Sequence, residues 1–253
     1  MRTGHLLSST ALTTSAMLAS GAAFAQPVYN WTGYYIGANV GYASTDIGQD
    51  LFVPAVTRFP SHFFDSSGRA TTVAGGIQAG YNWLFLPNWL AGIEADISYL
   101  GASRQQGFQF QNSTEDVVGV QKTRMRWLAT VRGRLGYTWL NTLVYATGGL
   151  AIGDVKSTVD ATRIDGPTAE AQFAGSYSAT RTGYVVGGGI EQALTNLVTL
   201  RLEYLHFDLG NFSYNVNLAS GLTTPRVPST WLAHGSVSGD IVRAAVNVKF
   251  GPP

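Results

Sequence analysis

The sequence contains no cysteine in 253 residues, which excludes disulfide bonds and thiol chemistry. Charged residues are also scarce, at 12% of the chain, about half the share usual in a soluble domain. The 16 Lys+Arg against 15 Asp+Glu leave a net charge of +1, so charge balance indicates neither nucleic-acid binding nor electrostatic adsorption to a membrane. After the N-terminal region no apolar run reaches about 18 residues, so no transmembrane helix is expected.

The first 25 residues have the form of a secretory signal peptide. Arg2 and His5 precede a mildly apolar stretch over residues 6–22, and residues 23–25 read Ala-Phe-Ala, a typical cleavage signal. The sequence therefore predicts cleavage near Ala25 and a mature chain over residues 26–253 that forms one domain.

The segment over residues 122–139 separates into two faces when every second residue is read. One face is apolar, and the other is strongly basic because it carries Arg124, Arg126, Arg132 and Arg134. Side chains of a strand alternate with a period of two, whereas a helix would scatter the arginines around its surface. The segment is therefore predicted to be a strand, in either a soluble sheet or a membrane barrel.

The same alternation recurs along the mature chain. It predicts eight strands over residues 34–43, 72–83, 89–100, 122–139, 143–153, 181–193, 198–209 and 240–250. The faces of the fifth strand, 143–153, are not settled by its pattern. Connections of roughly 20–30 residues alternate with connections of roughly five, as in an outer-membrane barrel.

Aromatic residues lie near both ends of these strands. One group falls at the predicted periplasmic ends: Tyr34, Tyr81, Trp83, Trp89, Tyr137, Trp139, Tyr145 and Phe250. The other falls nearer the outer ends: Tyr42, Tyr99, Trp127, Tyr184 and Tyr204. Two aromatic girdles are typical of transmembrane barrels. The predicted fold is therefore all-β: an eight-stranded antiparallel up-and-down transmembrane barrel with four long outer loops and short periplasmic turns.

Several motifs in order resemble one protein family over the whole mature chain. They are residues 31–42 (WTGYYIGANVGY), 75–83 (GGIQAGYNW), 93–96 (IEAD), 131–137 (VRGRLGY) and 202–204 (LEY). Together they resemble the small outer-membrane β-barrel proteins of alphaproteobacteria, often labelled "porin family" and related to OmpA-like and opacity-type membrane domains. The resemblance implies a location in the bacterial outer membrane.

The resemblance also implies partners: outer-membrane lipids and lipopolysaccharide, and the barrel-assembly machinery, with peptidoglycan and host surface molecules as further candidates. Family members end in an aromatic residue, whereas here Phe250 is followed by Gly251-Pro252-Pro253. We expect Phe250 to end the last strand. Residues 26–27, Gln-Pro, do not match the small residue that tethers some relatives to peptidoglycan.

The polar faces of the strands place many charges in a narrow lumen, which side chains fill in a barrel of eight strands. The predicted lumen network is Glu94, Asp96, Arg124, Arg126, Arg132, Arg134, Glu191, Arg201, Glu203, Arg243 and Lys249. Buried charges need partners, so a structural salt-bridge plug is the favoured interpretation. A narrow pore whose basic excess favours anions is the alternative, and carboxylate acid–base catalysis is the least favoured.

Haem binding is a further alternative that the resemblance raises, because some proteins similar to this family bind haem at the cell surface. The candidate ligands are His62, His206 and His234, which have no ligand spacing. No motif pairs a nucleophile with a base. The sequence therefore predicts a non-enzymatic structural barrel without cofactor or metal, with an anion-leaning porin or a surface receptor or adhesin for haem or host ligands as alternatives.

Overall fold

A computed structural model describes residues 29–54, 61–65, 67–111, 115–165, 169–221 and 230–250. The predicted signal peptide, its cleavage site and the Gly251-Pro252-Pro253 tail lie outside these residues. Over the described ranges, no helix is long and apolar enough to cross a membrane.

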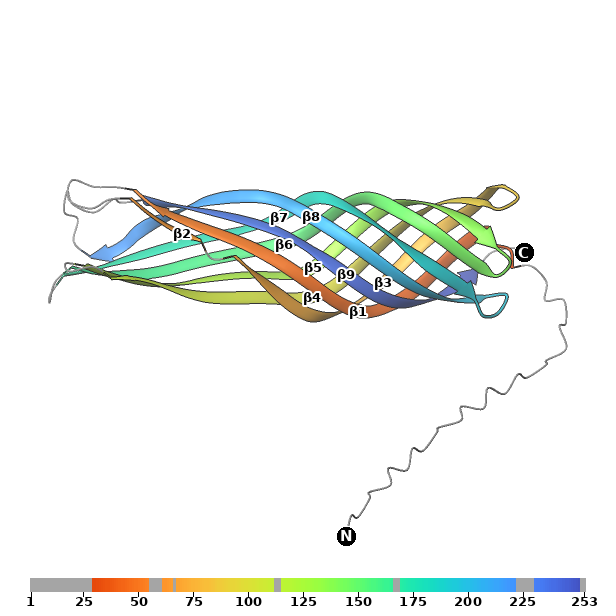
Figure 1. The fold of residues 1–253 in the computed structure, drawn as a ribbon, viewed down its shortest axis with the longest axis horizontal. Coiled ribbons are helices and arrows are strands. Elements are labelled where there is room, and N and C mark those ends of the chain that lie inside the picture. The colour runs from red at the N-terminus through yellow and green to blue at the C-terminus, as the bar shows by residue number, and fades with distance from the viewer. Residues whose placement is uncertain are drawn as a thin grey trace, which may run out of the picture.

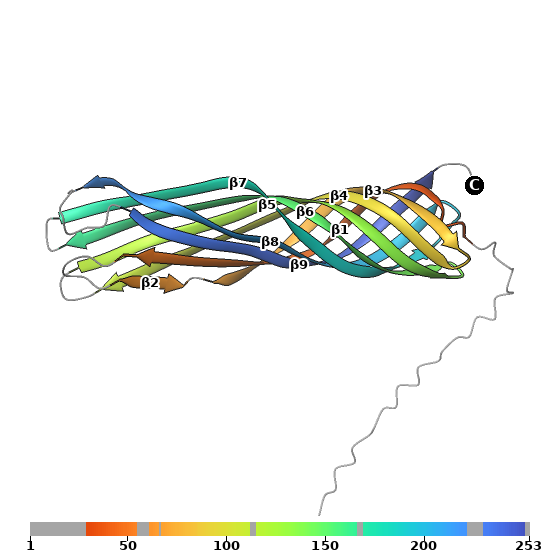
Figure 2. The same ribbon diagram turned by 90° about the horizontal axis from the view of Figure 1, so that it is seen from above.

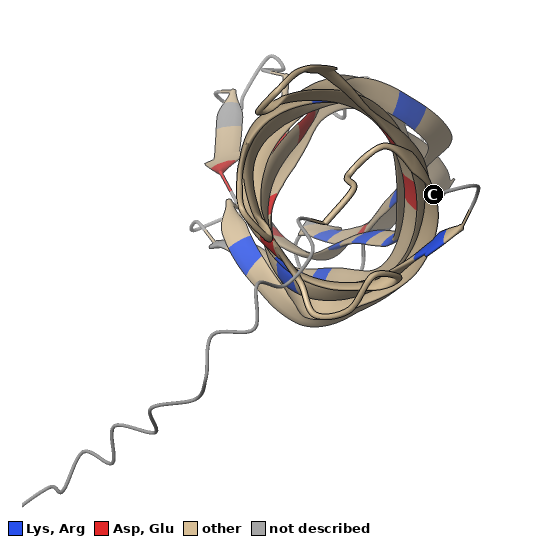
Figure 3. Cartoon of the chain, turned by 90° about the vertical axis from the view of Figure 1, so that its right-hand side faces the viewer, with Lys and Arg blue, Asp and Glu red and all other residues tan. Residues whose placement is uncertain are grey.

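The described chain consists of β-strands. They are β1 (Gly33–Val53), β2 (His62–Asp65), β3 (Gly68–Leu86), β4 (Trp89–Gln111), β5 (Glu115–Trp139), β6 (Thr142–Asp165), β7 (Ala169–Ala193), β8 (Val198–Gly221) and β9 (Thr230–Phe250). From β3 onward each strand pairs antiparallel with the next, β1 pairs with β3, and β1 also pairs with β9. The short β2 pairs with the far end of β1. The eight long strands therefore close into a ring, which confirms the predicted fold class (Figures 1 and 3).

The strands are far longer than predicted. The eight long strands have 19 to 25 residues, whereas about ten tilted residues suffice to cross a bilayer. The expectation of four long outer loops is therefore wrong. For example, β6 and β7 stay paired from Thr142–Gln192 to Asp165–Ala169, through the region 154–180 that was predicted to be a loop. The barrel is consequently an elongated tube (Figures 1 and 2).

The polarity of the wall inverts partway along the tube, which explains the missed strand extensions. In the half with the short turns, β9 points Val242, Val246 and Val248 outward and buries Arg243 and Asn247 inside. In the other half the same strand buries apolar side chains and turns polar ones outward. There Trp231, Val237 and Ile241 are buried, while Ser238 and Asp240 face outward. A search for strands with an apolar outer face therefore stops at the inversion.

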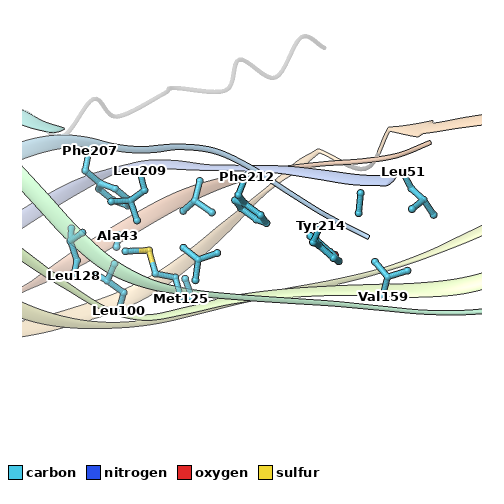
Figure 4. Close-up of a cluster of buried hydrophobic side chains, with 14 of the residues drawn as sticks. Ala43, Leu51, Leu100, Met125, Leu128, Val159, Phe207, Leu209, Phe212 and Tyr214 are labelled. Carbon is cyan, nitrogen blue, oxygen red and sulfur yellow. The ribbon is translucent and has the colours of Figure 1, made fainter. Parts of the chain in front are cut away.

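The far half of the tube has a hydrophobic core inside it. Figure 4 shows part of this outer core, with labelled side chains such as Leu51, Met125 and Phe207 reaching inward from several strands. The rings of Phe173 and Trp231 stack with centroids 3.9 Å apart. A fully buried side chain of this kind contributes roughly 1.5–3 kcal/mol. The outer half is thus built like a soluble barrel, and the inner half like a membrane barrel.

β-bulges lie where the two halves meet. In β5, Arg126 and Trp127 together oppose the single residue Asp154 of β6. Similar shifts occur in β4 at Gly101 and in β8 at Gly210, whose φ angles of 59° and 73° suit glycine. A bulge switches the faces of all residues beyond it.

The β5 bulge corrects the predicted lumen network. Leu128, Thr130, Arg132 and Arg134 point inside on one side of the bulge, but beyond it Met125 and Thr123 do. The prediction that Arg124 and Arg126 line the lumen is therefore wrong, because both are exposed on the outer wall. Unbroken alternation over residues 122–139 was the mistaken assumption.

The end of the tube with the short turns agrees with the prediction for the periplasmic side. Two-residue turns follow β3 and β5, and a four-residue turn follows β7. β9 ends at Phe250, as expected. The aromatic girdle loses one member, because Tyr145 is buried inside the tube. The fifth predicted strand is now assigned: Leu143, Tyr145 and Ala151 point inward.

Candidate functional site

The inner half of the lumen is the strongest candidate site, because it gathers most of the predicted charges. Eight of the predicted residues are buried there: Glu94, Asp96, Arg132, Arg134, Glu191, Arg201, Glu203 and Arg243. Lys249 lies at the turn end, where its Nζ donates to the backbone oxygen of Asn30 at 2.5 Å. Arg124 and Arg126 lie outside.

Arg132 is at the centre of this network. Its Nη2 lies 2.5 Å from Glu94 Oε1 and 3.0 Å from Asp96 Oδ2. Its Nη1 lies 3.1 Å from Glu203 Oε1. Arg132 and Glu94 are direct cross-strand partners, so the register of β4 and β5 sets the first contact. One guanidinium thus joins three carboxylates from two separate parts of the wall.

Two arginines hold the carboxylates on the turn side of Arg132. Arg134 Nη2 donates to Glu191 Oε2 at 2.9 Å. Arg201 Nε donates to the same oxygen at 3.1 Å, and its Nη1 donates to Glu94 Oε2 at 2.6 Å. These contacts connect β4, β5, β7 and β8 across the lumen.

Arg243 completes the network on the other side of Arg132. Its Nη1 donates to Asp96 Oδ1 at 2.9 Å, and its Nε donates to Glu203 Oε2 at 2.8 Å. Each buried carboxylate therefore contacts at least two guanidiniums. Charge-assisted contacts of this kind are the strong ones.

Two tyrosines belong to the network, although the sequence did not predict them there. Tyr35 donates to Glu94 Oε2 at 2.5 Å, and Tyr145 donates to Glu203 Oε1 at 2.7 Å. Tyr35 lies on the polar face of its strand, and this position could have indicated that its side chain points into the lumen. Its ring fits because Gly80 has no side chain; a Cβ there would lie 2.4 Å from the Tyr35 hydroxyl. Tyr145 gave no such signal, since apolar Leu143 shares its face.

Buried neutral side chains also line this part of the lumen. Asn39 donates to Gln78 at 2.6 Å, Gln78 donates to Asn247 at 2.7 Å, and Asn247 donates to Glu191 at 2.9 Å. This chain of amides runs across the lumen between β1, β3, β9 and β7. It explains why the polar faces of these strands carry amides as well as charges.

The charges of the buried network balance. Four carboxylates (Glu94, Asp96, Glu191 and Glu203) face four guanidiniums (Arg132, Arg134, Arg201 and Arg243). The basic excess predicted from sequence came largely from Arg124 and Arg126, which lie outside the tube. Because taking charges out of water is costly unless they are paired, balance and close packing both suit a permanent brace.

The turn end of the lumen is closed by the segment that precedes β1. Tyr29 and Trp31 are buried in a cluster with Leu90, Leu143 and Tyr145. Their rings meet edge to face at 4.7 Å, and the Tyr29 amide donates to Asn141 Oδ1 at 3.2 Å. The tube is thus filled at three levels: this N-terminal cluster, the charged network and the outer core.

The predicted haem ligands do not converge. His206 Nδ1 lies 2.9 Å from Asp240 Oδ1, and His234 lies six residues before Asp240 on β9. Six residues of strand span roughly 20 Å, so the two imidazoles cannot ligate one iron. The side chain of His62 lies outside the described residues. Within the described chain, no group of three or more His, Asp or Glu is placed to hold a metal ion.

The sequence is similar to known outer-membrane proteins over most of its length. The family described as "outer membrane protein beta-barrel domain" matches residues 11–250. The 31 kDa outer-membrane immunogenic protein of Brucella melitensis is 37% identical over 193 residues, which cover 72% of each chain. The 22 kDa outer membrane protein of Rhizobium leguminosarum is 31% identical over 195 residues, covering 77% of this chain and 72% of the relative.

Solved structures show lower similarity. The outer membrane protein OprG of Pseudomonas aeruginosa gives a TM-score of 0.48 at 12% identity, covering 88% of this chain and 99% of that one. The outer membrane protease OmpT of Escherichia coli gives 0.46 at 10% identity, covering 89% and 99%.

Proposed function

The chain belongs to the family of outer membrane protein β-barrel domains and is a protein of the bacterial outer membrane, and we propose that it is a sealed structural barrel. In this role it braces the envelope and carries a rigid extension outside the cell. Passive permeability is at most weak.

The filled lumen is the observation that carries this function. An open channel needs a continuous water-filled path, but Arg132 and Arg201 are each 1% exposed and bridge opposite parts of the wall. Apolar side chains occupy the outer half, and Tyr29 and Trp31 occupy the turn end. An ion would have to displace all three layers in order to cross.

The anion-leaning pore has less support than it had from the sequence. Anion preference requires an excess of positive charge along the path, and in the network of the inner half the four buried carboxylates are matched by four guanidiniums. A catalytic role for the carboxylates is also disfavoured, because guanidiniums and hydroxyls already occupy their oxygens. We therefore propose a protein without enzymatic activity.

Surface display is supported by the outer half of the tube. Its strands continue well beyond the outer aromatic residues Tyr42, Tyr99 and Tyr204, and we propose that their far ends lie outside the cell. The Brucella relatives are named immunogenic outer-membrane proteins. We propose that this chain likewise presents its outer tip at the cell surface, where host molecules are candidate partners. The barrel-assembly machinery and peptidoglycan also remain predicted partners.

Planar-bilayer conductance tests the sealed barrel. Purified, folded protein is added to a bilayer whose sensitivity is checked with a channel-forming peptide. We expect no stable single-channel steps. Reproducible anion-selective steps that disappear in Arg132→Ala and Arg134→Ala variants would establish the pore instead.

A further inference from the structure

The outer wall carries an unusual group of cations just beyond the outer aromatic girdle. Lys122, Arg124 and Arg126 point outward from β5, and Lys156 points outward from β6. The β5 bulge is what turns the two arginines out of the lumen. We call Lys122, Arg124, Arg126 and Lys156 the cationic sector.

Two of these cations are set directly against each other. Arg124 and Lys156 are cross-strand partners, and the Cβ atoms of such partners lie roughly 4.5–5.5 Å apart. Like charges in this position destabilise a sheet. An arrangement of this kind becomes favourable when an anion binds between the two side chains.

The carboxylates nearby do not neutralise the sector. Asp154 is engaged with Arg126, whose Nε lies 3.0 Å from Asp154 Oδ2. Asp160 lies diagonally across the ladder from Lys122, without an ion pair between them. Over the described part of the chain, Lys122, Arg124 and Lys156 have no ion pair within 4.0 Å.

The opposite side of the tube has the reverse character at the same level. Asp46, Asp208 and Asp240 face outward there from β1, β8 and β9. Local contacts satisfy all three: Arg69 Nε lies 2.8 Å from Asp46 Oδ1, the Gly210 amide donates to Asp208 Oδ1 at 2.7 Å, and the Tyr204 hydroxyl donates to Asp240 Oδ1 at 2.6 Å. The aspartates on that side are thus engaged locally, whereas Lys122, Arg124 and Lys156 have no ion pair within the described part of the chain.

The height of the sector matches a lipid headgroup layer. Arg124 lies three residues beyond Trp127 of the outer girdle, which is roughly 7–8 Å of height for a tilted strand. Each headgroup layer is about 5–8 Å thick. The side chains of Arg124 and Lys156 can therefore reach the phosphates of the outer leaflet.

An apolar depression of about 810 Å³ lies in the lipid-facing wall across β9, β1, β3, β4 and β5, and its β5 edge at Ala129 and Val131 lies below the sector. Ala38, Ala79, Ala95 and Ala129 contribute to its lining. On β4 and β5 the order along the wall is continuous: the Tyr99–Trp127 pair, then Ile97–Ala129, then Ala95–Val131. A cationic site above an apolar depression is complementary to an amphiphile with an anionic headgroup.

We propose that Lys122, Arg124 and Lys156 bind the phosphates of a phosphorylated outer-leaflet lipid, whose acyl chains lie in the depression. Such a lipid tethers one side of the tube to its surrounding leaflet. The site lies on the outer wall and does not depend on whether the lumen conducts, so conductance and lipid binding can fail separately.

Native mass spectrometry of the folded protein in a neutral detergent tests this site. The protein is titrated with bis-phosphorylated lipid A, phosphatidylglycerol or phosphatidylcholine. We expect affinity to fall in that order. A Lys122→Gln/Arg124→Gln/Lys156→Gln variant should bind lipid A at least tenfold more weakly, because each cation near a lipid surface contributes about fivefold.

Two further variants serve as controls. Arg69→Gln removes an exposed cation at a similar level outside the sector and should leave lipid A binding unchanged. Ala129→Phe fills the depression and should weaken lipid A binding while the cations remain. Heat-modifiable migration on gels verifies that each variant is folded.

Three results would overturn the lipid site. The first is that the triple variant binds lipid A as tightly as the wild-type protein. The second is that Arg69→Gln weakens lipid A binding as much as the triple variant does. The third is that excess inorganic phosphate displaces lipid A. The last would identify a free-phosphate site in place of a lipid site.

Discussion

Arg126 and Arg132 lie six residues apart on β5 and share the same parity in the sequence, yet their environments are opposite. The side chain of Arg126 is 66% exposed on the outer wall, while that of Arg132 is fully buried among three carboxylates. The bulge between them accounts for this difference. The two residues therefore make a matched pair for testing the buried network.

Replacing Arg132 with methionine should destabilise the barrel by about 3–5 kcal/mol, because three buried carboxylates lose a shared partner. Arg126→Met should cost at most about 1 kcal/mol, as expected for an exposed ion pair. Urea unfolding of protein refolded in lipid vesicles measures both. Similar losses in the two variants would contradict the placement of these arginines.

Asp154 holds the β5 bulge in place. Its Oδ1 accepts from the backbone amides of Arg126 and Trp127 at 2.9 and 3.0 Å. Burial acts to raise the pKa of this carboxyl, but the Trp127 amide and the contacts with Arg126 outweigh it and leave the pKa below its ordinary value of 3.8. A lowered pKa means that Asp154 stabilises the fold above pH 3.8 and loses this effect as the pH falls through the lowered value.

The expected effect of Asp154→Ala is faster hydrogen exchange at the amides of Arg126 and Trp127, by at least about fivefold at neutral pH, since a lost hydrogen bond to a charged group costs 1 kcal/mol or more. Lowering the pH below 3.8 should reduce the difference between the variant and the unchanged protein. If exchange at both amides stays the same, Asp154 does not hold the bulge.

Among the elements, the sequence predicted the membrane half of each long strand well. Lipid-facing side chains such as Ile36, Ile93 and Val246 alternate with polar lumen residues, and this pattern needs no tertiary information. The outer halves were missed because their alternation has the opposite sense, with Val155 and Val159 inside and Lys156 outside. Bulges were missed because a single extra residue leaves no mark on composition.

The strand extensions predict resistance to proteases. Lys156 in β6 and Arg181 in β7 are trypsin sites within paired strands, although the sequence placed Lys156 in a loop. Trypsin added outside vesicles that carry the folded protein should leave the bonds after Lys156 and Arg181 intact, and heat-unfolded protein should be cut at both. Mass spectrometry of the fragments distinguishes these cases. Cleavage after Lys156 in the folded protein would restore the loop interpretation.

The molecule is a single tube with two kinds of wall. The inner half has an apolar exterior and a polar, charge-balanced interior, and the outer half reverses both. The sequence predicted the eight-stranded ring and eight of the eleven charged residues placed inside it. It could not predict the hydrophobic core of the outer half, because this core joins residues as distant as Leu51, Phe173 and Trp231.

A spin-label scan along β9 can detect the inversion of the wall one position at a time. The chain has no cysteine, so single cysteines can be introduced and labelled one at a time. Labels at Val242, Val246 and Val248 should be accessible to oxygen from the lipid. Labels at Ser236, Ser238 and Asp240 should be accessible to a water-soluble nickel reagent.

The decisive positions are the inward ones of the outer half, Ala233, Val237 and Ile241. The sealed tube predicts that labels there are immobilised and reach neither oxygen nor the nickel reagent. Mobile labels at these positions with free access to the aqueous reagent would contradict the hydrophobic outer core and the sealed barrel that we propose from it.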